Sequence, residues 1–559
     1  MSNRQKFWFS GLWASPFGIA FSLFYLIAKK TLLELFVPGK YDSYIWSLDI
    51  LVIIMIILII DFIFFLKNLK RKLVDGRTDF RPGMKTDVID LSNDKRKAQN
   101  HPVPKEYLSK EPDGFTLGYY HNRYLRVPFL NSPEHQLILG APGSNKSTVT
   151  LNALIHNYNF ATPEDKLHAV LAIDCKPELS RLSIFEGRND VLILNPSNPN
   201  SVGFDPYYGL SPDSTDDELR ERFDVIARTL VVNTGGDNSF FYASAQKILT
   251  ATLMYGFRLG YNLAESIRLV LGIATEDLIA EILTNEQMES HPKIRSLVRV
   301  YDGKDSDAMQ DVTMTLQQDL SIFDMDTVTE FFSSANNLRA TPHDLINGTS
   351  LFLSIPDHLL KMYSPIFRMI VQLCLKHLVS VPEWTRKGKR PIWFLIDEAG
   401  SIGKLPDLIE EGLPRARSKG CQITLICQSY GQLETTYGEA AARSILDCCK
   451  TAIIFSCNDT RSAEMISKWT GSYRETKLSK HSNGTSSIRI PSSQNESQEY
   501  RPVMDVSDIK MLERNNQVLL FGKEGWCLCR KLPFYEIPIH LSKSQEIEKR
   551  NRPFYPRHP

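Results

Sequence analysis

Apolar and polar positions alternate in blocks along the chain, as is typical of proteins in which strands and helices alternate. Apolar runs of strand length occupy four stretches: 136–139, 169–173, 392–396 and 421–427. A polar residue directly follows each of the last three. Helix-like runs separate these strands, which favours a doubly wound α/β fold with a mainly parallel sheet. Such sheets bind ligands beyond the carboxyl ends of their strands, so we expect the site there.

Residues from about 215 to 340 show a different pattern. Strand-like runs are scarce, and apolar residues recur with helical periodicity over four stretches: 216–232, 240–259, 276–284 and 307–320. Core-like sequence resumes near 349–355. We therefore predict an all-α insertion within the α/β domain.

Two long apolar stretches lie near the amino terminus, at residues 7–28 and 44–66. Each matches the roughly 20 helical residues that the hydrocarbon core of a bilayer requires. Lysine and arginine precede the first stretch and follow the second, which predicts two transmembrane helices with both termini in the cytoplasm. A cleaved signal peptide is disfavoured because no small-residue cleavage site follows the first stretch.

Polar and proline-punctuated segments divide the rest of the chain. Alternation from Phe115 to Pro128 around His121-Asn122 predicts a hairpin, and the Ser/Asn-rich stretch from Lys477 to Tyr500 is interpreted as a mobile loop. The predicted parts are a membrane anchor (1–72), a linker (73–112), the first part of a nucleotide-binding domain (113–214), the all-α insertion (215–345), the second part of the nucleotide-binding domain (346–540) and a basic tail (541–559).

A phosphate-binding loop is predicted directly after the strand at 136–139. The pattern G-x-x-x-x-G-K-[ST] followed by a helix is met at all positions but one. The residues that would bind the nucleotide are Gly140, Ala141, Pro142, Gly143, Ser144, Asn145, Lys146, Ser147 and Thr148. Backbone N–H groups of such a loop bind phosphates, Lys146 would neutralise the β and γ phosphates, and the Ser147 hydroxyl would bind Mg²⁺.

Asn145 stands where the pattern has its second glycine. That glycine serves backbone conformation, and asparagine is the non-glycine residue that best tolerates a positive φ. We therefore hypothesise an intact ATPase whose nucleotide affinity or turnover is altered.

Two carboxylates end the strand at 392–396. Asp397 is the candidate for holding Mg²⁺, and Glu398 is the candidate general base for the attacking water. Gln428 ends the next strand, where a polar side chain can sense the γ phosphate. Asp174, after the strand at 169–173, adds a further polar group to the same edge.

Charge and cysteine content exclude few classes of function. The 65 basic and 64 acidic residues leave a net charge of +1, so no global basic field marks a nucleic-acid-binding protein. Most of the nine cysteines lie in apolar, strand-like runs, which favours buried free thiols in a reducing cytosol.

The order of several motifs resembles the TraD/TraG-like type IV coupling proteins, especially the TraD branch of F-type conjugation. The matching runs are ILNP at 193–196, the acidic pair Asp397-Glu398, and KLPDL, QSYGQLE and YGE between residues 404 and 439. The resemblance covers nearly the whole chain.

This resemblance implies a RecA/FtsK-like motor core and a homo-hexameric ATPase in the bacterial inner membrane. It further implies partners, namely single-stranded DNA with its relaxase and accessory relaxosome proteins, components of the type IV secretion channel, and membrane lipid. By the same resemblance Arg417 is the candidate arginine finger for the neighbouring subunit, with Arg415 as the second choice. Surface solvation or contact with helix carbonyls is the alternative for either arginine.

Two other functions stay open at this point. The chain could be a receptor that recruits protein effectors to the same channel, with the helical insertion as the docking surface. It could also be a membrane scaffold in which nucleotide controls only assembly. The presence of Lys146, Ser147, Asp397, Glu398 and Gln428 disfavours the scaffold, because a degenerate ATPase usually loses its acid or its lysine.

Overall fold

The computed structural model describes most of the chain after residue 102. The described residues are 103–127, 134–161, 167–233, 235, 239–303, 306–333, 338–455, 457–480, 494–522 and 525–551. The chain divides into two units, residues 1–80 and 81–559, and all the described residues belong to the second. None of the described helices is long and apolar enough to cross a bilayer. The predicted spans at 7–28 and 44–66 lie outside the described residues.

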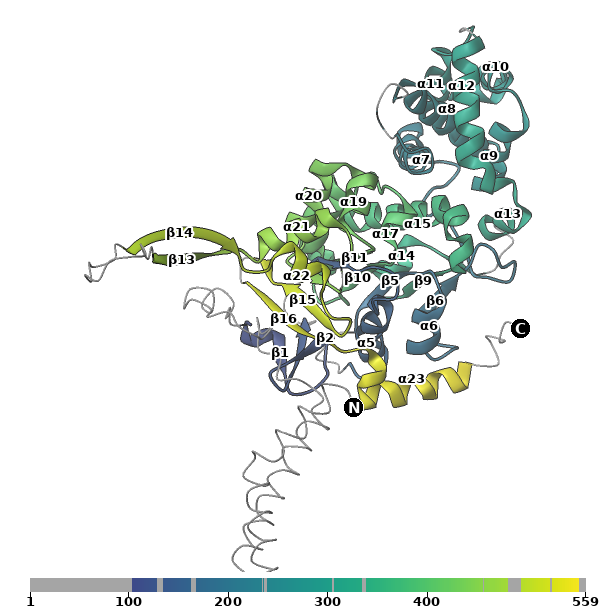
Figure 1. Ribbon diagram of the computed structural model, residues 1–559. Helices are drawn as coiled ribbons and strands as arrows, with labels where there is room; N and C mark the ends of the chain where they lie inside the picture. The colour runs from purple at the N-terminus through teal and green to yellow at the C-terminus, as the bar shows by residue number, and fades with distance from the viewer. Residues whose placement is uncertain are drawn as a thin grey trace, which may run out of the picture. The chain divides into compact units, whose positions relative to one another are not determined.

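A 12-stranded sheet organises the described residues, in the order β1-β3-β2-β16-β15-β12-β4-β11-β10-β5-β9-β6 (Figure 1). Its strands are β1 Leu108–Ser109, β2 Phe115–Tyr120, β3 Arg123–Val127, β4 Gln136–Leu139, β5 Ala169–Asp174, β6 Val191–Leu194, β9 Ser350–Ser354, β10 Ile392–Ile396, β11 Cys421–Cys427, β12 Thr451–Ile454, β15 Asn516–Leu520 and β16 Trp526–Lys531. The strands from β12 to β6 run parallel, and those from β15 to β1 are joined by antiparallel pairs. The predicted α/β fold with a mainly parallel sheet is confirmed.

Side chains of the buried strands point alternately to two hydrophobic cores, one on each face of the sheet. In β5, Leu171 and Ile173 belong to one core, while Val170 and Ala172 belong to the other. Figure 1 shows helices over both faces. Helices α5 Lys146–Asn159, α6 Glu178–Ser183 and α23 Pro538–Asn551 lie on one side; α14 Pro342–Ile346, α15 Leu360–Ser380, α17 Ala399–Ile402, α19 Tyr430–Tyr437, α20 Glu439–Cys448 and α21 Thr460–Trp469 lie on the other.

A run of helices separates β6 from β9 in the sequence. It comprises α7 Asp216–Leu230, α8 Ser239–Arg258, α9 Leu263–Gly272, α10 Thr275–Thr284, α11 Pro292–Arg299, α12 Ser306–Leu320 and α13 Asp326–Phe332. Helix α7 begins after Thr215 because that residue and Glu218 form a capping box, with hydrogen bonds of 3.3 and 2.7 Å. A short parallel pair, β7 Gly203–Phe204 with β8 Arg339–Ala340, joins the two ends of the run.

The predicted hairpin at 115–128 is formed by β2 and β3. Its turn residues His121 and Asn122 both have positive φ values, 45° and 59°. Asparagine adopts that conformation at little cost, which is why the turn is placed there. All nine cysteines lie among the described residues and are free, as predicted.

The two ends of the segment from Lys477 to Tyr500 differ from the predicted loop, and its middle, 481–493, lies outside the described residues. Strands β13 Ser472–Lys480 and β14 Gln494–Pro502 pair antiparallel over nine residues each, and they form a separate two-stranded sheet. The backbone ladder satisfies N–H and C=O groups that a loop would leave to water, so the polar composition is compatible with a ribbon. The predicted boundary at residue 541 falls inside helix α23, which packs on α5 and α6.

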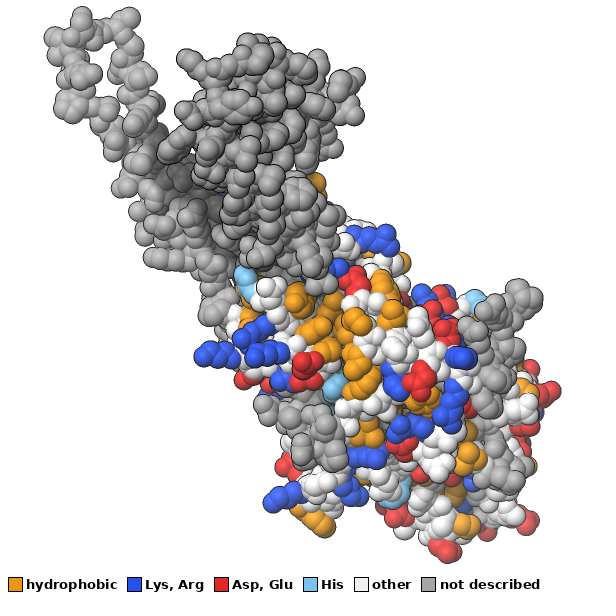
Figure 2. Space-filling view, turned by 90° about the horizontal axis from the view of Figure 1, so that it is seen from below, with side chains coloured by type: hydrophobic (Ala, Val, Ile, Leu, Met, Phe, Trp, Pro, Cys, Tyr) orange, Lys and Arg blue, Asp and Glu red, His pale blue; other side chains and the backbone are white. Residues whose placement is uncertain are grey.

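Basic and acidic side chains are interspersed on the face drawn in Figure 2, and hydrophobic side chains gather near its middle. This face therefore presents no extended field of one sign, in agreement with the net charge of +1.

Candidate functional site

The predicted phosphate-binding loop connects β4 to α5, and two of its residues have positive φ. Gly143 and Asn145 have φ values of 75° and 71°, and Asn145 directly precedes the first turn of α5. Gly140 donates a 3.1 Å hydrogen bond to the carbonyl of Cys427 at the end of β11. A Cβ on Gly140 would lie only 2.5 Å from Ser144 Oγ, so glycine is required at this turn.

Lys146 is buried at the start of α5, and its Nζ donates a hydrogen bond back to the carbonyl of Gly140. Burial lowers the pKa of Lys146, while the nearby carboxylates of Glu398 and Asp397 oppose that shift. Ser147 follows in the first turn of α5, and the Thr148 hydroxyl donates a 2.9 Å hydrogen bond to the Asn145 carbonyl. The loop lysine is therefore close enough to the acidic pair for the opposite charges to interact.

The two predicted carboxylates follow β10 at the same edge of the sheet. Asp397 is buried, and its Oδ1 accepts a 3.0 Å hydrogen bond from the Glu398 N–H. Burial and the neighbouring Glu398 carboxylate raise the pKa of Asp397 to about 7, although Lys146 favours its ionised form. Glu398 has a φ of 51°, an unusual conformation for a non-glycine residue that concentrates at functional sites.

Gln428 reaches across from the end of β11 to the acidic pair. Its Nε2 donates a 3.0 Å hydrogen bond to Glu398 Oε2, and its backbone N–H donates one of 3.0 Å to Gln432 Oε1. A Cβ on Gly400 would lie 2.2 Å from Gln432 Cδ, so this contact depends on glycine there. Glu398 and Gln428, 30 residues apart in sequence, thus form one pair.

Asp174 lies at the same edge of the sheet, but its carboxylate is already hydrogen-bonded to the start of α6. Its carboxylate accepts hydrogen bonds from the N–H groups of Glu178, Leu179 and Ser180 and from the Ser180 hydroxyl, between 2.9 and 3.2 Å. It therefore caps α6. The sequence indicated a polar group here but not this structural role.

Arg417 lies at the opposite edge of the sheet. It begins the short helix Arg417–Lys419, which directly precedes the amino end of β11, whereas Gln428 follows the carboxyl end. Seven residues at about 3.3 Å each separate the two edges by about 20 Å. Arg417 and Arg415 are both exposed, and the separation of about 20 Å keeps Arg417 away from the nucleotide-site candidates of its own chain.

His135 fixes the segment that carries these two arginines. Its Nδ1 accepts a 3.0 Å hydrogen bond from the Ile423 N–H, and its Nε2 lies 2.7 Å from the Leu413 carbonyl. Nε2 therefore carries the proton of a neutral ring. Burial, followed by the charge of Arg417, lowers the pKa of His135 to about 4.

Lys531 is a neighbour of the loop that the sequence did not single out. It ends β16, and its Nζ donates a 3.3 Å hydrogen bond to the Ser144 carbonyl while lying 5.2 Å from the centre of the Phe455 ring. It is only 2% exposed, and burial lowers its pKa to about 8. The contact joins residues 387 positions apart, so no local pattern could reveal it.

The arrangement provides the parts of a phosphoryl-transfer site. Positive charge and backbone N–H groups stand on one side, at the loop and Lys146, and carboxylates stand on the other, at Asp397 and Glu398. The hydrogen bond from Gln428 holds one of the two Glu398 oxygens, and a carboxylate oxygen at such an edge can accept a proton.

Residues 125–528 match the family described as type IV secretion-system coupling protein DNA-binding domain. The chain belongs to this coupling-protein family.

Two of the curated proteins that this chain resembles are themselves named coupling proteins, and their identity to it is low. VirD4, a type IV secretion system-coupling protein of Bartonella quintana (strain Toulouse), is 24% identical over 351 residues, which cover 60% of this chain and 53% of that protein. The coupling protein TraD of Escherichia coli (strain K12) is 32% identical over 184 residues, or 33% of this chain and 25% of TraD. The chain thus spans about half the length of VirD4, and the predicted closeness to the TraD branch is only loosely supported.

Solved coupling proteins share the fold. The plasmid coupling protein TrwB in complex with ADP and Mg²⁺ has a TM-score of 0.55 and 17% identity, over 77% of this chain and 90% of TrwB. The unbound monoclinic form of TrwBdeltaN70 has a TM-score of 0.53 and 16% identity, over the same shares. At this identity the likeness establishes the RecA-type α/β fold of the coupling proteins.

Proposed function

We propose that this chain is an ATPase that couples a DNA–relaxase substrate to a type IV secretion channel and pumps single-stranded DNA during bacterial conjugation. The observation that carries the proposal is the meeting of Lys146, Asp397, Glu398 and Gln428 at one sheet edge. The DNA substrate is supported by the description of the matching family and by the names of the relatives.

The residues present fit ATP and Mg²⁺. Gly143 and Asn145 adopt the positive φ values that turn loop N–H groups toward a bound anion, and Lys146 brings a buried positive charge to the same loop. Asp397 offers a carboxylate held against the Glu398 N–H, and Ser147 offers a hydroxyl in the first helical turn. Oxygen ligands of this kind suit Mg²⁺. Bound ATP would supply the phosphoanhydride bond whose hydrolysis drives the motor.

Each residue then has one task. The loop and Lys146 bind the phosphates, and Ser147 and Asp397 hold Mg²⁺. Glu398 accepts a proton from water, a role worth about 10²- to 10⁴-fold in rate. Gln428 orients the Glu398 carboxylate through the 3.0 Å hydrogen bond.

The position of Arg417 favours action between subunits. It lies on the amino edge, about 20 Å from the carboxyl edge of its own sheet, and it is exposed. In a homo-hexameric ring, the amino edge of one copy would face the nucleotide of the next. Arg417 would then stabilise transition-state charge there, as arginine fingers do.

We also propose that residues 7–28 and 44–66 anchor the chain in the bacterial inner membrane, with both termini in the cytoplasm. The basis is their length, their apolar composition and the flanking lysines and arginines. Cysteine accessibility from either side of the membrane in intact cells tests this topology.

DNA transfer by cells that carry point variants tests the motor. We expect Lys146→Ala and Glu398→Gln each to abolish transfer, since the first removes phosphate binding and the second removes the base. Retained transfer in Glu398→Gln beside its loss in Lys146→Ala would favour a scaffold in which nucleotide only controls assembly. Wild-type export of protein with no export of DNA would favour a receptor for protein effectors.

A further inference from the structure

One continuous segment links the catalytic candidate Glu398 to the arginine candidate Arg417. This linking segment, residues 399–416, contains α17, the π-helical turn Leu408–Gly412 and the short helix α18 Leu413–Ala416. Under the proposed function its two ends serve the nucleotide sites of two different subunits. Its position therefore bears on both sites.

Helix α15 holds the linking segment with three polar side chains spaced four residues apart. Such spacing places Arg368, Gln372 and Lys376 along one face of the helix. The three contact successive points of the segment: Arg368 Nη1 donates to the Ile402 carbonyl at 3.1 Å, Gln372 Nε2 to Asp407 Oδ2 at 2.8 Å, and Lys376 Nζ to the Glu411 carboxylate at 2.9 Å.

Arg368 also binds the helical run. Its Nε donates a 2.8 Å hydrogen bond to the Thr229 carbonyl and its Nη2 one of 3.3 Å to the Leu230 carbonyl, both in the last turn of α7. Carbonyls at a helix end lack intrahelical partners and attract cations. One guanidinium thus joins the carboxyl end of α7 to that of α17, the helix that follows Glu398.

The surroundings of Arg368 are shaped for this contact. The side chain is buried, with 9% of its residue surface exposed. Gly403 has a φ of 91°, and a Cβ there would lie 2.8 Å from Arg368 Nη1. Any other residue at 403 would therefore strain the backbone and push the guanidinium away.

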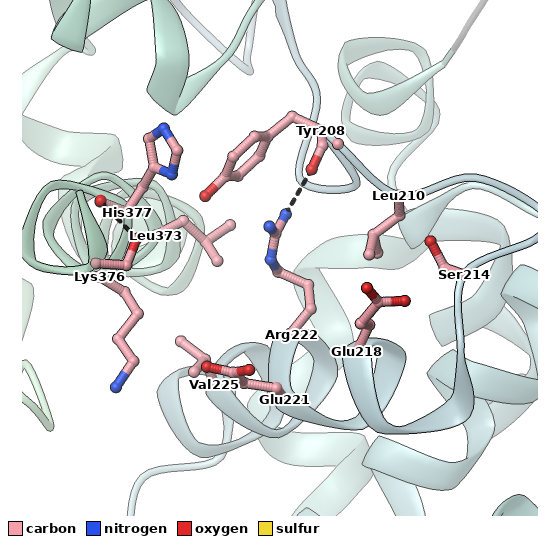
Figure 3. Close-up of a pocket in the computed structure, with 12 residues that line it drawn as sticks. Tyr208, Leu210, Ser214, Glu218, Glu221, Arg222, Val225, Leu373, Lys376 and His377 are labelled. Carbon is pink, nitrogen blue, oxygen red and sulfur yellow. Dashed lines mark hydrogen bonds between the residues drawn. The ribbon is translucent and has the colours of Figure 1, made fainter. Parts of the chain in front are cut away.

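A second, weaker contact acts at the same place. Arg228 of α7 brings Nη1 to 3.8 Å from Asp407 Oδ1, the residue that Gln372 also binds. Farther along, α7, α15 and the stretch 208–214 line an open pocket of about 340 Å³. Figure 3 shows Glu221, Arg222 and Val225 of α7 across this pocket from Leu373 and Lys376 of α15. The polar contacts of Arg368 and Arg228 thus lie beside this open pocket.

We propose that Arg368 is a positioning residue that couples the nucleotide site to the helical run α7–α13, by tying the end of α17 to the end of α7. Movement of Glu398 and α17 on nucleotide binding is passed through the guanidinium to α7, and movement of α7 returns by the same route. The proposal rests on the proposed nucleotide site and is independent of the identity of the transported substrate.

Arg368→Lys in the full-length protein tests the coupling, because lysine keeps the charge but cannot span three carbonyls. In the wild type, a non-hydrolysable ATP analogue is expected to change amide hydrogen exchange in α7. In Arg368→Lys we expect that change to disappear and kcat to fall about tenfold, with KM for ATP within about twofold of the wild type.

Arg222→Lys is the matched control. Arg222 also lies on α7 and donates two 3.0 Å hydrogen bonds, to the carbonyls of Pro206 and Tyr208, but it does not contact the linking segment. We expect this variant to keep the response of α7. If Arg368→Lys fails to fold, Arg228→Gln is the substitute variant, because Arg228 is half-exposed and its loss should disturb the fold less. We expect Arg228→Gln to weaken the exchange response of α7 in part.

A full exchange response of α7 in Arg368→Lys, or in Arg228→Gln where only that variant folds, overturns the proposal. The proposal is also overturned if the analogue binds to the wild type and hydrogen exchange in α7 does not change. Absence of nucleotide binding by the wild type would instead overturn the proposed function. ATP hydrolysis at a rate that DNA does not change would contradict the proposed DNA pump, but it would not contradict the coupling through Arg368.

Discussion

The side-chain amide of Gln428 donates a 3.0 Å hydrogen bond to Oε2 of Glu398. This pair joins the ends of β10 and β11 directly beside the phosphate-binding loop. A general base must be oriented toward the proton that it accepts. The proposed mechanism therefore depends on this hydrogen bond, which orients the Glu398 carboxylate.

Removing either member of the pair should separate binding from hydrolysis. We expect Glu398→Gln to lower kcat by about 100-fold or more and Gln428→Ala by about tenfold, with ATP affinity nearly unchanged. Steady-state hydrolysis and equilibrium nucleotide binding measure the two effects. If the pair acts as a unit, the double variant will be no slower than Glu398→Gln; multiplied losses would mean independent roles.

Asn145 carries a φ of 71°, so its tolerance of positive φ is used in the loop. Replacement by a β-branched residue in that region costs about 1–2 kcal/mol, and Asn145→Val should therefore weaken ATP binding about tenfold. Asn145→Gly tests the hypothesis of altered affinity or turnover, and we expect a change of about twofold or more because glycine removes the residual strain. Equal affinity and turnover in the glycine variant would make the position neutral.

Lys531 should contribute to nucleotide binding although it lies outside the motif. We expect Lys531→Met to weaken ATP binding about tenfold, because the variant loses a buried positive charge 3.3 Å from the Ser144 carbonyl. Methionine loses the cation–π contact of the ammonium with the Phe455 ring but can fill the same buried space, and thermal unfolding should report an intact fold. Arg530→Met is the control, since Arg530 pairs with Glu536 at 2.5 Å instead of contacting the loop. Equal losses in both variants would remove Lys531 from the site.

Burial of a neutral His135 predicts a pH dependence of stability. The pKa of His135 is lowered to about 4, whereas an unfolded histidine titrates near its usual value of about 6.5. Between these values the unfolded state binds the proton and the folded state does not, so the free energy of unfolding falls as pH drops from about 6.5 to about 4. Thermal unfolding at several pH values should show this slope.

His135→Asn gives the matched comparison for that slope. Asparagine keeps a hydrogen-bond acceptor near the Ile423 N–H but cannot gain the proton. We expect a lower melting temperature at pH 7 and a shallower decline on acidification. His377 and His540, whose pKa values are lowered to about 4 and about 3, keep part of the slope. An unchanged slope would exclude His135 as a source.

Arg417 and Arg415 differ in their expected effects. Arg417→Ala should retain ATP binding and lose most hydrolysis, because an arginine finger acts on the transition state. Arg415 is also exposed, but it is only the second choice for the finger, so Arg415→Ala should keep near-normal hydrolysis. Mixing Arg417→Ala with Lys146→Ala should restore part of the activity if the finger acts between subunits. No restoration would argue against that arrangement.

The sequence could predict the parts of the site that follow from local pattern. The loop before Lys146 and the acids after β10 are continuous motifs, and Gln428 follows from the rule that ligands bind beyond the carboxyl ends of parallel strands. The hairpin at His121-Asn122 was predicted for the same reason, because its turn chemistry is local.

The remaining features depend on distant packing. Lys531 reaches Ser144 only because β16 runs in the same direction as β4 after two antiparallel steps through β15. The spacing of Arg368, Gln372 and Lys376 is visible in the sequence, but their partners in the linking segment are not. The ribbon β13–β14 was missed because its polar sequence lacks apolar alternation, while the paired backbone forms the ladder.

ATP hydrolysis by the full-length protein, measured with and without single-stranded DNA, tests the central claim most directly. We predict that DNA raises kcat and that Glu398→Gln lowers both the basal and the stimulated activity by about 100-fold or more. Wild-type hydrolysis that is the same with single-stranded DNA, with double-stranded DNA and without DNA would contradict the DNA pump.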